Sequence, residues 1–300
     1  MRVILNGKRA GEPAIRKAIQ SVRHAGHAVD VRVTWETGDA HRYATEAVRD
    51  GIDCVVAGGG DGTINEIGNA LLTCDSEGDV SMGVLPLGTA NDFATAGGIP
   101  VEDPLAALRL VANQAATPID VGLVNDRHFI NVVSGGYGAE VTTVTDPMLK
   151  RTLGAFAYFL TGLVNVQTIT PRYTRIAGPG FAWEGPVLAI AVSNGQQAGG
   201  GFRVGAKARV DDGMLDLMIL PELPIAKLRD VIQDIQKIES SDELHAVVYR
   251  QLTEITIEAA DGLQINLDGE PIRGERFEFR ILPKRLNFVL PNESPLLRTR

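Results

Sequence analysis

The first 115 or so residues alternate short apolar runs with segments of helical spacing, and this alternation constrains the fold more than any other feature. Repeated strand-then-helix units of this kind are typical of a parallel sheet with helices on both faces. The expected strands are Val3–Leu5, Val29–Val33, Cys54–Ala57 and Met82–Leu85, and the expected helices are Pro13–Ala25, Ala40–Arg49, Ile64–Leu72 and Leu105–Val111. In such sheets ligands bind beyond the carboxyl ends of the strands.

After about residue 120 the pattern changes to strands separated by Gly, Pro and Asp turns. Helical spacing interrupts the strands around 147–166 and 224–238, and the boundary lies near Ile119–Gly122. We therefore expect a second, strand-rich domain with the architecture of a sandwich. Its expected strands are Phe129–Val133, Val187–Val192, Leu215–Leu220, Ile255–Glu258, Gln264–Leu267, Phe277–Ile281 and Asn287–Leu290.

The composition is that of a soluble globular protein, because 44% of the residues are hydrophobic and 22% are charged. Its net charge of -8 argues against nucleic acid as the main partner, since binding a phosphate backbone normally needs a basic surface. The two cysteines, Cys54 and Cys74, form no CxxC motif, which favours a reducing compartment. The N-terminus has the pattern of a strand and turn rather than a signal peptide, so we expect a cytoplasmic protein.

The segment from Thr152 to Pro171 carries no charged residue and has about the length of a membrane span. Seven glycine and polar residues interrupt it, so its mean hydropathy is modest. The favoured interpretation is a mostly buried helix. The alternatives are an apolar helix that dips into a membrane surface and, last, a true span.

A glycine loop, Gly58–Asn65, follows the expected strand at Cys54–Ala57 and precedes a helix. It lacks the lysine of the P-loop, and its glycines miss the dinucleotide fingerprint because Thr63 stands where the third glycine belongs. Residues without Cβ let backbone N–H groups approach phosphate oxygens closely, and the following helix adds its positive end. Asp61 would repel a polyphosphate unless a cation lay between them, so it indicates a magnesium-bound nucleotide. The alternative is a tight turn in which Asp61 and Thr63 act as caps.

A second loop, Leu85–Phe93, also follows an expected strand and opens a helix. Gly88 and Thr89 can contact phosphate, and Asn91 and Asp92 supply oxygen ligands or hydrogen bonds. Ordinary helix capping by Asn91 or Asp92 explains the same residues equally well.

Two acidic turns lie in the second part of the chain. Val210–Asp216 is either a plain turn or a hard-cation site built from a carboxylate and main-chain carbonyls. Leu267–Glu270 is a strand-end turn in which either carboxylate could serve as a general base. The histidines show no metal-ligand spacing except for His24 and His27, which are three residues apart at the end of a helix and are better explained as a solvated terminus. No GxSxG motif supports a hydrolase.

Taken together, these motifs resemble the diacylglycerol and sphingosine kinase superfamily, and most closely its bacterial branch of YegS-type lipid kinases. The similar strings occur in the family's order: GGDGT at 59–63, PLGTANDF at 86–93, Asp212-Gly213, and Asp268-Gly269-Glu270. Further similar strings are VRVTWE at 31–36, INE at 64–66, NDFAT at 91–95, NGQQAGGG at 194–201 and SPLLR at 294–298. The resemblance covers essentially the whole chain, although GGDGT alone also occurs in NAD kinases and phosphofructokinases.

The resemblance implies a Rossmann-like, phosphofructokinase-like nucleotide-binding domain over 1–122, joined by the C-terminal tail at about 292–300, and a β-sandwich domain over 123–291. It implies ATP contacts at Thr34, at Gly60, Asp61, Gly62, Thr63, Ile64, Asn65 and Glu66, and at Thr89, to which Asn91 and Asp92 are added from the second loop. A magnesium site would use main-chain oxygens of Arg209 and Met214 and the side chain of Asp212, with Ca²⁺ as an alternative occupant. Glu270 would be the proton acceptor, and Asp61 would act with it in catalysis.

The function that follows is an ATP-dependent lipid kinase that phosphorylates a hydroxyl of a membrane lipid, with phosphatidylglycerol as the first choice of acceptor. We expect a cytoplasmic protein with transient contact at the inner face of the membrane, partly through 147–166. The alternatives are a diacylglycerol kinase, a soluble-substrate kinase of the NAD-kinase type and a nucleotide sensor without catalysis. Many diacylglycerol kinases have arginine at the position of Thr95, so the acceptor preference does not transfer from them.

Overall fold

The computed structural model describes residues 1–74, 78–136, 171–224, 227–240, 244–267 and 270–298. Contacts within the chain divide it into two compact units: Met1–Val121 together with Pro283–Arg300, and Gly122–Leu282. The expected helix around 147–166 lies outside the described residues. Within the described part of the chain, no helix is both long and apolar enough to cross a membrane.

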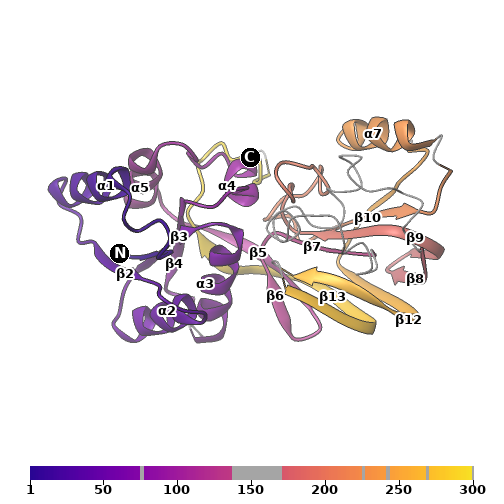
Figure 1. Ribbon diagram of the computed structural model, residues 1–300, viewed down its shortest axis with the longest axis horizontal. Coiled ribbons are helices and arrows are strands. Elements are labelled where there is room, and N and C mark those ends of the chain that lie inside the picture. Colours follow the sequence, from indigo (N-terminus) through magenta and orange to yellow (C-terminus); the bar gives the residue numbers. More distant parts are fainter. Residues whose placement is uncertain (75–77, 137–170, 225–226, 241–243, 268–269, 299–300) are drawn as a thin grey trace. The chain divides into compact units, whose positions relative to one another are not determined.

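The first unit is built on a parallel sheet in the order β2-β1-β3-β4 (Figure 1). The strands are β1 (Arg2–Leu5), β2 (Asp30–Val33), β3 (Cys54–Gly59) and β4 (Ser81–Pro86). Leu5 pairs with Gly58 and Gly59 pairs with Pro86, so these strands end level with one another. The loops that follow the strands therefore share one edge of the sheet, which confirms the expected parallel arrangement.

Helices cover both faces of this sheet. The helix α1 (Pro13–His24) packs with α5 (Pro104–Asn113), and α2 (Asp39–Arg49) packs with α3 (Asp61–Cys74). In α1, Ile15, Ala18, Ile19 and Val22 are buried at helical spacing, and Pro13 occupies the first turn, where its missing N–H costs nothing. A short helix, α4 (Asp92–Ala96), follows β4. The chain's end returns to this unit, because Phe288 pairs in parallel with Met82.

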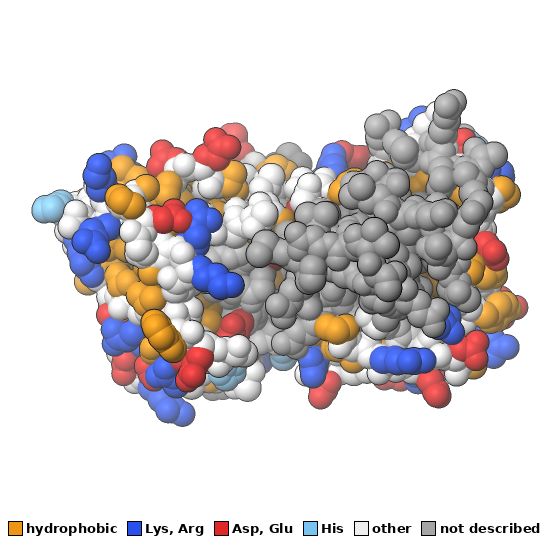
Figure 2. Space-filling view, in the orientation of Figure 1, with side chains coloured by type: hydrophobic (Ala, Val, Ile, Leu, Met, Phe, Trp, Pro, Cys, Tyr) orange, Lys and Arg blue, Asp and Glu red, His pale blue; other side chains and the backbone are white. Residues whose placement is uncertain are grey.

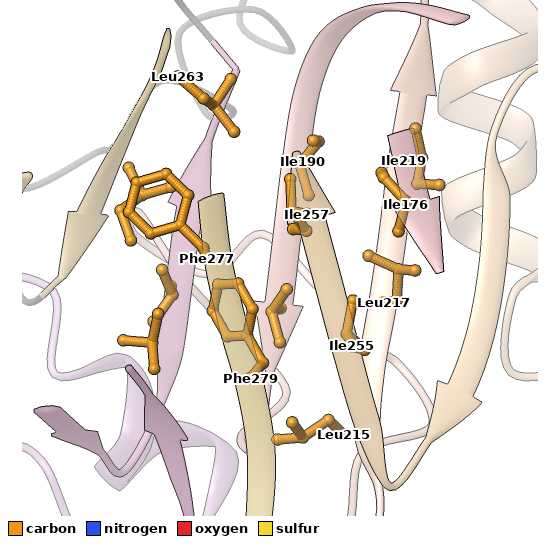
Figure 3. Close-up of a cluster of buried hydrophobic side chains, with 14 of the residues drawn as sticks. Ile176, Ile190, Leu215, Leu217, Ile219, Ile255, Ile257, Leu263, Phe277 and Phe279 are labelled. Carbon is orange, nitrogen blue, oxygen red and sulfur yellow. The ribbon is translucent and has the colours of Figure 1, made fainter. Parts of the chain in front are cut away.

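The second unit contains antiparallel strands in the order β11-β10-β9-β7-β12-β13, and β8 pairs with both β9 and β12. The strands of this part of the chain are β5 (Thr117–Val124), β6 (Arg127–Phe129), β7 (Val132–Gly135), β8 (Arg172–Gly178), β9 (Phe181–Ser193), β10 (Leu215–Pro221), β11 (Val248–Leu252), β12 (Glu254–Leu267) and β13 (Glu270–Phe288). Figure 3 shows side chains from these strands, Ile190, Leu217, Ile257 and Phe277 among them, filling one apolar core. A second cluster lies beside α7 (Leu228–Lys237), where Val231 packs with Met218 and Leu220.

Several strand predictions for this part of the chain need correction. The expected strands Ile255–Glu258 and Gln264–Leu267 are one strand, β12, because the pairing with β13 shifts register between Glu258 and Leu263 instead of breaking. Gly262 adopts a φ of +76° there, so the turn-like residues form an irregularity within the ladder. Likewise Phe277–Ile281 belongs to the long strand β13, and the expected separate strand Asn287–Leu290 is only the end of β13, which stops at Phe288.

Other strands were not predicted, or were predicted as one where the structure has two. The expected strand Phe129–Val133 divides between β6 and β7. The strands β5, β8 and β11 lacked a clear sequence signal. In β8 only Thr174 and Ile176 are buried, so its pattern is weakly apolar, and pairing with β9 and β12 determines its conformation.

Both cysteines are free. On the face drawn in Figure 2, acidic and basic side chains are interspersed over the described surface.

Candidate functional site

The glycine loop connects β3 directly to α3. The strand ends at Gly59, the helix begins at Asp61, and the carbonyl of Gly60 accepts hydrogen bonds from the N–H groups of Thr63 (2.9 Å) and Ile64 (3.1 Å). The amides at the very start of α3 therefore precede its ladder of helical hydrogen bonds, and they lie at the positive end of the helix. A loop of this form can bind an anion through its backbone.

The two glycine loops touch each other backbone to backbone. A Cβ placed on Gly88 would lie 2.5 Å from the Cα of Gly60, and one placed on Gly60 would lie 3.0 Å from the Cα of Gly88. Any side chain at Gly88 would therefore push the loops apart. The contact creates a continuous surface of main chain across the ends of β3 and β4.

Asp61 holds the second loop to the first. Its carboxylate oxygens accept hydrogen bonds from the N–H groups of Asp92 (3.1 Å) and Phe93 (3.0 Å), at the start of α4. Burial raises the pKa of Asp61, although the two N–H donors oppose that effect. Asp61 therefore has a capping role toward α4, whatever it binds in addition.

Asn91 closes the second loop on itself. Its Oδ1 accepts from the N–H of Gly88 (2.8 Å), and its Nδ2 donates to the carbonyl of the same residue (2.9 Å). Its φ of 51° is one that asparagine tolerates. Thr89 is exposed between them, whereas Asp92 is buried.

The remaining predicted nucleotide contacts lie along the same edge of the sheet. Thr34 follows β2, and its Oγ1 accepts a hydrogen bond from the N–H of Gly7 in the loop after β1 (3.3 Å). Glu66 accepts one from the N–H of His41 in α2 (3.3 Å). The Oδ1 of Asn65 is buried and has no hydrogen-bond partner among the described residues. The structure thus brings Thr34, residues 60–66 and residues 89–92 to one edge of unit 1.

Arg9 also belongs to this edge, although it is not among the predicted site residues. Its Nη1 donates to the carbonyl of Leu87 (3.0 Å), and its guanidinium pairs with Glu12. The loop after β1 is thereby tied to the loop after β4. The sequence feature that could have identified Arg9 is a cation in the loop after a strand of a parallel sheet, with an acid three residues further along the chain.

The predicted second-domain cation site is a single turn before β10. Asp212 Oδ1 accepts from the N–H of Met214 (2.9 Å), and the Arg209 side chain donates to the carbonyl of Ala208 (2.9 Å). Across the described ranges, no group of three or more His, Cys, Asp or Glu side chains is arranged to hold a metal. The predicted ligands in this turn are the carboxylate of Asp212 and main-chain carbonyls, which is a donor set for a hard cation that keeps several waters.

A buried acid lies directly after this turn. Asp216 is fully buried in β10 and accepts a hydrogen bond from the Tyr249 hydroxyl. That hydroxyl also accepts from the N–H of Lys207 (3.1 Å), so the pair fixes the backbone that leads into the turn. Burial raises the pKa of Asp216 to about 7.

Glu270, the predicted proton acceptor, is the first residue of β13, and its backbone pairs with Leu267 of β12. The neighbouring Asp268 and Gly269 lie outside the described residues.

Comparison with known proteins decides the family. Residues 1–124 match the family model described as the diacylglycerol kinase catalytic domain, and residues 131–290 match the YegS C-terminal NAD kinase beta sandwich-like domain. A protein of Pseudomonas aeruginosa (strain UCBPP-PA14), named "Probable lipid kinase YegS-like", is 45% identical over 99% of this chain and 96% of its own length. The chain belongs to the YegS-like lipid kinase family.

Other members give the same result. A relative of the same name in Xanthomonas euvesicatoria pv. vesicatoria (strain 85-10) is 43% identical over 99% of this chain and 97% of its own length. The one in Yersinia enterocolitica is 42% identical over 98% of each chain. The resemblance found in the motifs is therefore confirmed, and this YegS-like chain is a member of a family of enzymes.

The fold is shared with solved structures. A diacylglycerol kinase of Bacillus anthracis str. Sterne superposes on this YegS-like chain with a TM-score of 0.73, at 21% identity and with 97% of each chain covered. A second structure from that organism gives a TM-score of 0.81 at 24% identity, over 97% of this chain and 95% of its own length. The expected sandwich-like C-terminal domain is confirmed by the family match over residues 131–290.

Proposed function

We propose that this chain transfers the γ-phosphate of Mg-ATP to a hydroxyl of a membrane lipid, with phosphatidylglycerol as the acceptor. The observation that carries the proposal is the backbone contact between Gly60 and Gly88, which presents main-chain amides and a helix start in a member of a lipid kinase family. In this proposal unit 1 is a Rossmann-like, phosphofructokinase-like nucleotide domain.

The residues along the edge fit a bound nucleotide. Backbone amides of residues 60–62 would bind phosphate oxygens, and Thr63 and Thr89 would add hydroxyl donors. The buried Oδ1 of Asn65 lacks a donor among the described residues, and a ligand hydroxyl or a bound water would satisfy it. The Asp61 carboxylate contacts the backbone of Asp92, and the lone pairs that its hydrogen bonds leave free would favour a cation there.

A base and two cations complete the proposed chemistry. Glu270 would accept the proton of the lipid hydroxyl as that oxygen attacks the γ-phosphorus in line, and ADP would leave as the bond from the γ-phosphorus to its bridging oxygen breaks. Magnesium would neutralise the phosphate charge where Asp61 and Asp92 hold it. A second cation, Mg²⁺ or Ca²⁺, would bind the carboxylate of Asp212 and the carbonyls of Arg209 and Met214. We further propose that the protein acts from the cytoplasm by transient contact with the membrane.

Diacylglycerol is the second candidate acceptor, because the family model over residues 1–124 is named for diacylglycerol kinases. Labelled ATP mixed with phosphatidylglycerol vesicles, with phosphatidylcholine vesicles that carry diacylglycerol, or with NAD tests both candidates. We expect label in phosphatidylglycerol, with Glu270→Gln as the background. Label in diacylglycerol alone would show that diacylglycerol is the acceptor, and the chain would still be a lipid kinase. Label only in NAD, or in none of the three, would refute the proposal of a lipid kinase.

A further inference from the structure

Trp35 is an unusually exposed tryptophan. Its side chain is 94% accessible, although tryptophan is among the most buried residue types on average. Its backbone is nevertheless well anchored: the N–H of Trp35 donates to Asp39 Oδ2 (2.7 Å), and the N–H of the preceding Thr34 donates to the carbonyl of Leu5 (2.9 Å). The fold therefore presents this indole to solvent from an ordered position.

The position lies on the ligand-binding edge of the sheet. Trp35 comes just after β2, which neighbours β1, and β1 neighbours β3 with its glycine loop. Two strand spacings of ~4.8 Å separate the ends of β2 and β3, about 10 Å along the edge. Gly7, in the loop after the intervening strand β1, has no side chain to obstruct that path. A nucleotide whose phosphates lie at Gly58–Thr63 can extend its sugar and base in this direction.

The charges around Trp35 favour contact with an uncharged ring of a ligand rather than contact with a membrane surface. Glu36 and Asp39 follow it, and the nearest cations in the chain, Arg32 and Arg42, are paired with Asp30 and Asp39. An indole that anchors to an anionic bilayer is normally flanked by cations. A flat, uncharged base needs none, because stacking on an aromatic ring is sufficient to bind it.

We propose that Trp35 stacks on the base of the bound nucleotide and is a binding residue of the kinase. This inference rests on the proposed use of ATP. Because every base has a π-face, stacking predicts affinity for purine nucleotides in general rather than strict selection of adenine.

Intrinsic fluorescence tests the stacking directly, because the chain has only two tryptophans, Trp35 and Trp183. In a Trp183→Phe variant, ATP and GTP with magnesium should quench the emission of Trp35, and inorganic tripolyphosphate should leave it unchanged. If Trp183→Phe does not fold, the difference between the wild type and Trp35→Phe gives the same signal.

Calorimetry supplies the second measurement. Trp35→Ala should weaken ATP binding roughly ten-fold, ~1.4 kcal/mol, with tripolyphosphate binding unchanged, whereas Trp35→Phe should retain most of the affinity. Tyr173→Ala removes an exposed aromatic residue of β8 and should change neither. Folding is not at risk in Trp35→Ala, since the side chain contributes little burial.

The outcomes separate this inference from the proposed function. If the wild type binds ATP and Trp35→Ala binds it equally well, the stacking is refuted and the kinase proposal stands. If Trp35→Ala keeps its ATP affinity but loses binding to phosphatidylglycerol vesicles, Trp35 is a membrane contact and the stacking is again refuted. If the wild type neither binds ATP nor transfers its phosphate, the proposed function fails and the stacking fails with it.

Discussion

At the scale of single residues, Asp61 illustrates how one side chain can serve more than one purpose. Its charge beside the expected phosphate site indicates a metal, and its place at a helix start indicates a cap. The structure shows the capping, but of the neighbouring helix α4 rather than of its own helix. A sequence pattern indicates a helix cap only when the capping residue lies within a few residues of the helix. The cap on α4 comes from a residue 31 positions away in the chain, so the pattern does not predict it.

Glu270 gives the sharpest prediction at this scale. Positioned bases typically contribute ~10²–10⁴ to the rate, so Glu270→Gln should lower kcat by about that factor. ATP affinity should remain near the wild-type value, because the predicted nucleotide contacts lie elsewhere. Steady-state kinetics and calorimetry measure the two quantities separately.

The matched control is Glu275→Gln, an exposed glutamate on the same strand. It should retain wild-type kcat. Full activity in Glu270→Gln would show that another group accepts the proton.

At the scale of elements, the start of α2 shows why helix boundaries depend on specific side chains. Asp39 is buried and accepts hydrogen bonds from the N–H groups of Trp35 and Glu36, and it pairs with Arg42 one turn later. The preceding Gly38 adopts a φ of +88°, which lets the chain turn into the helix. Together these contacts fix the loop that carries Thr34 and Trp35.

The stability contributed by Asp39 should depend on pH. The N–H donor of Trp35 and the guanidinium of Arg42 lower the pKa of Asp39 to about 2, below its ordinary value of 3.8. A lowered pKa means that the unfolded chain takes up the proton first, so this contribution is present above about pH 4 and is lost as the pH falls toward about 2. Asp39→Asn should therefore be less stable than the wild type near neutral pH, and the difference should shrink in acid.

Thermal unfolding monitored by circular dichroism at about pH 7, 4 and 2.5 checks the expectation. A difference in Tm that stays constant across this range would show that the Asp39 carboxylate contributes no charge-dependent stability.

At the scale of the whole molecule, the first unit is discontinuous in sequence. Residues 283–300 pack with residues 1–121, where Phe288 meets Phe93 edge to face at 5.1 Å between ring centroids. Further along, Ser294 Oγ donates to the carbonyl of Gly97 (2.8 Å), and Leu296 is fully buried. The end of the chain therefore holds the end of α4, whose beginning is capped by Asp61.

Leu296→Ala tests this packing of the chain's end against the first unit. Deleting a buried leucine side chain typically costs ~2–5 kcal/mol, through lost burial and a residual cavity. We expect a loss of that size in the free energy of unfolding measured with denaturant. Leu297→Ala, at a half-buried neighbour, should cost clearly less; equal costs would show that the tail's packing is not specific.

Two kinds of information were readable from the sequence alone. Apolar periodicity predicted the parallel sheet and its helices in the first unit, because each element there repeats a regular spacing of buried residues such as Ile15, Ile19 and Val22. The ordered motifs predicted the family, because short strings in a fixed order are a property of the chain itself.

Only the tertiary structure decided how distant residues combine. The contact of Gly60 with Gly88, the cap that Asp61 places on α4 and the reach of Arg9 to Leu87 all join segments far apart in sequence. The strand β8 forms because two neighbours pair with it, and Trp35 is exposed because the loop after β2 turns it outward. The local pattern of residues determines whether a segment forms a helix or a strand. Which other residues the segment contacts depends on long-range strand pairing and burial, and these exist only once the whole chain is folded.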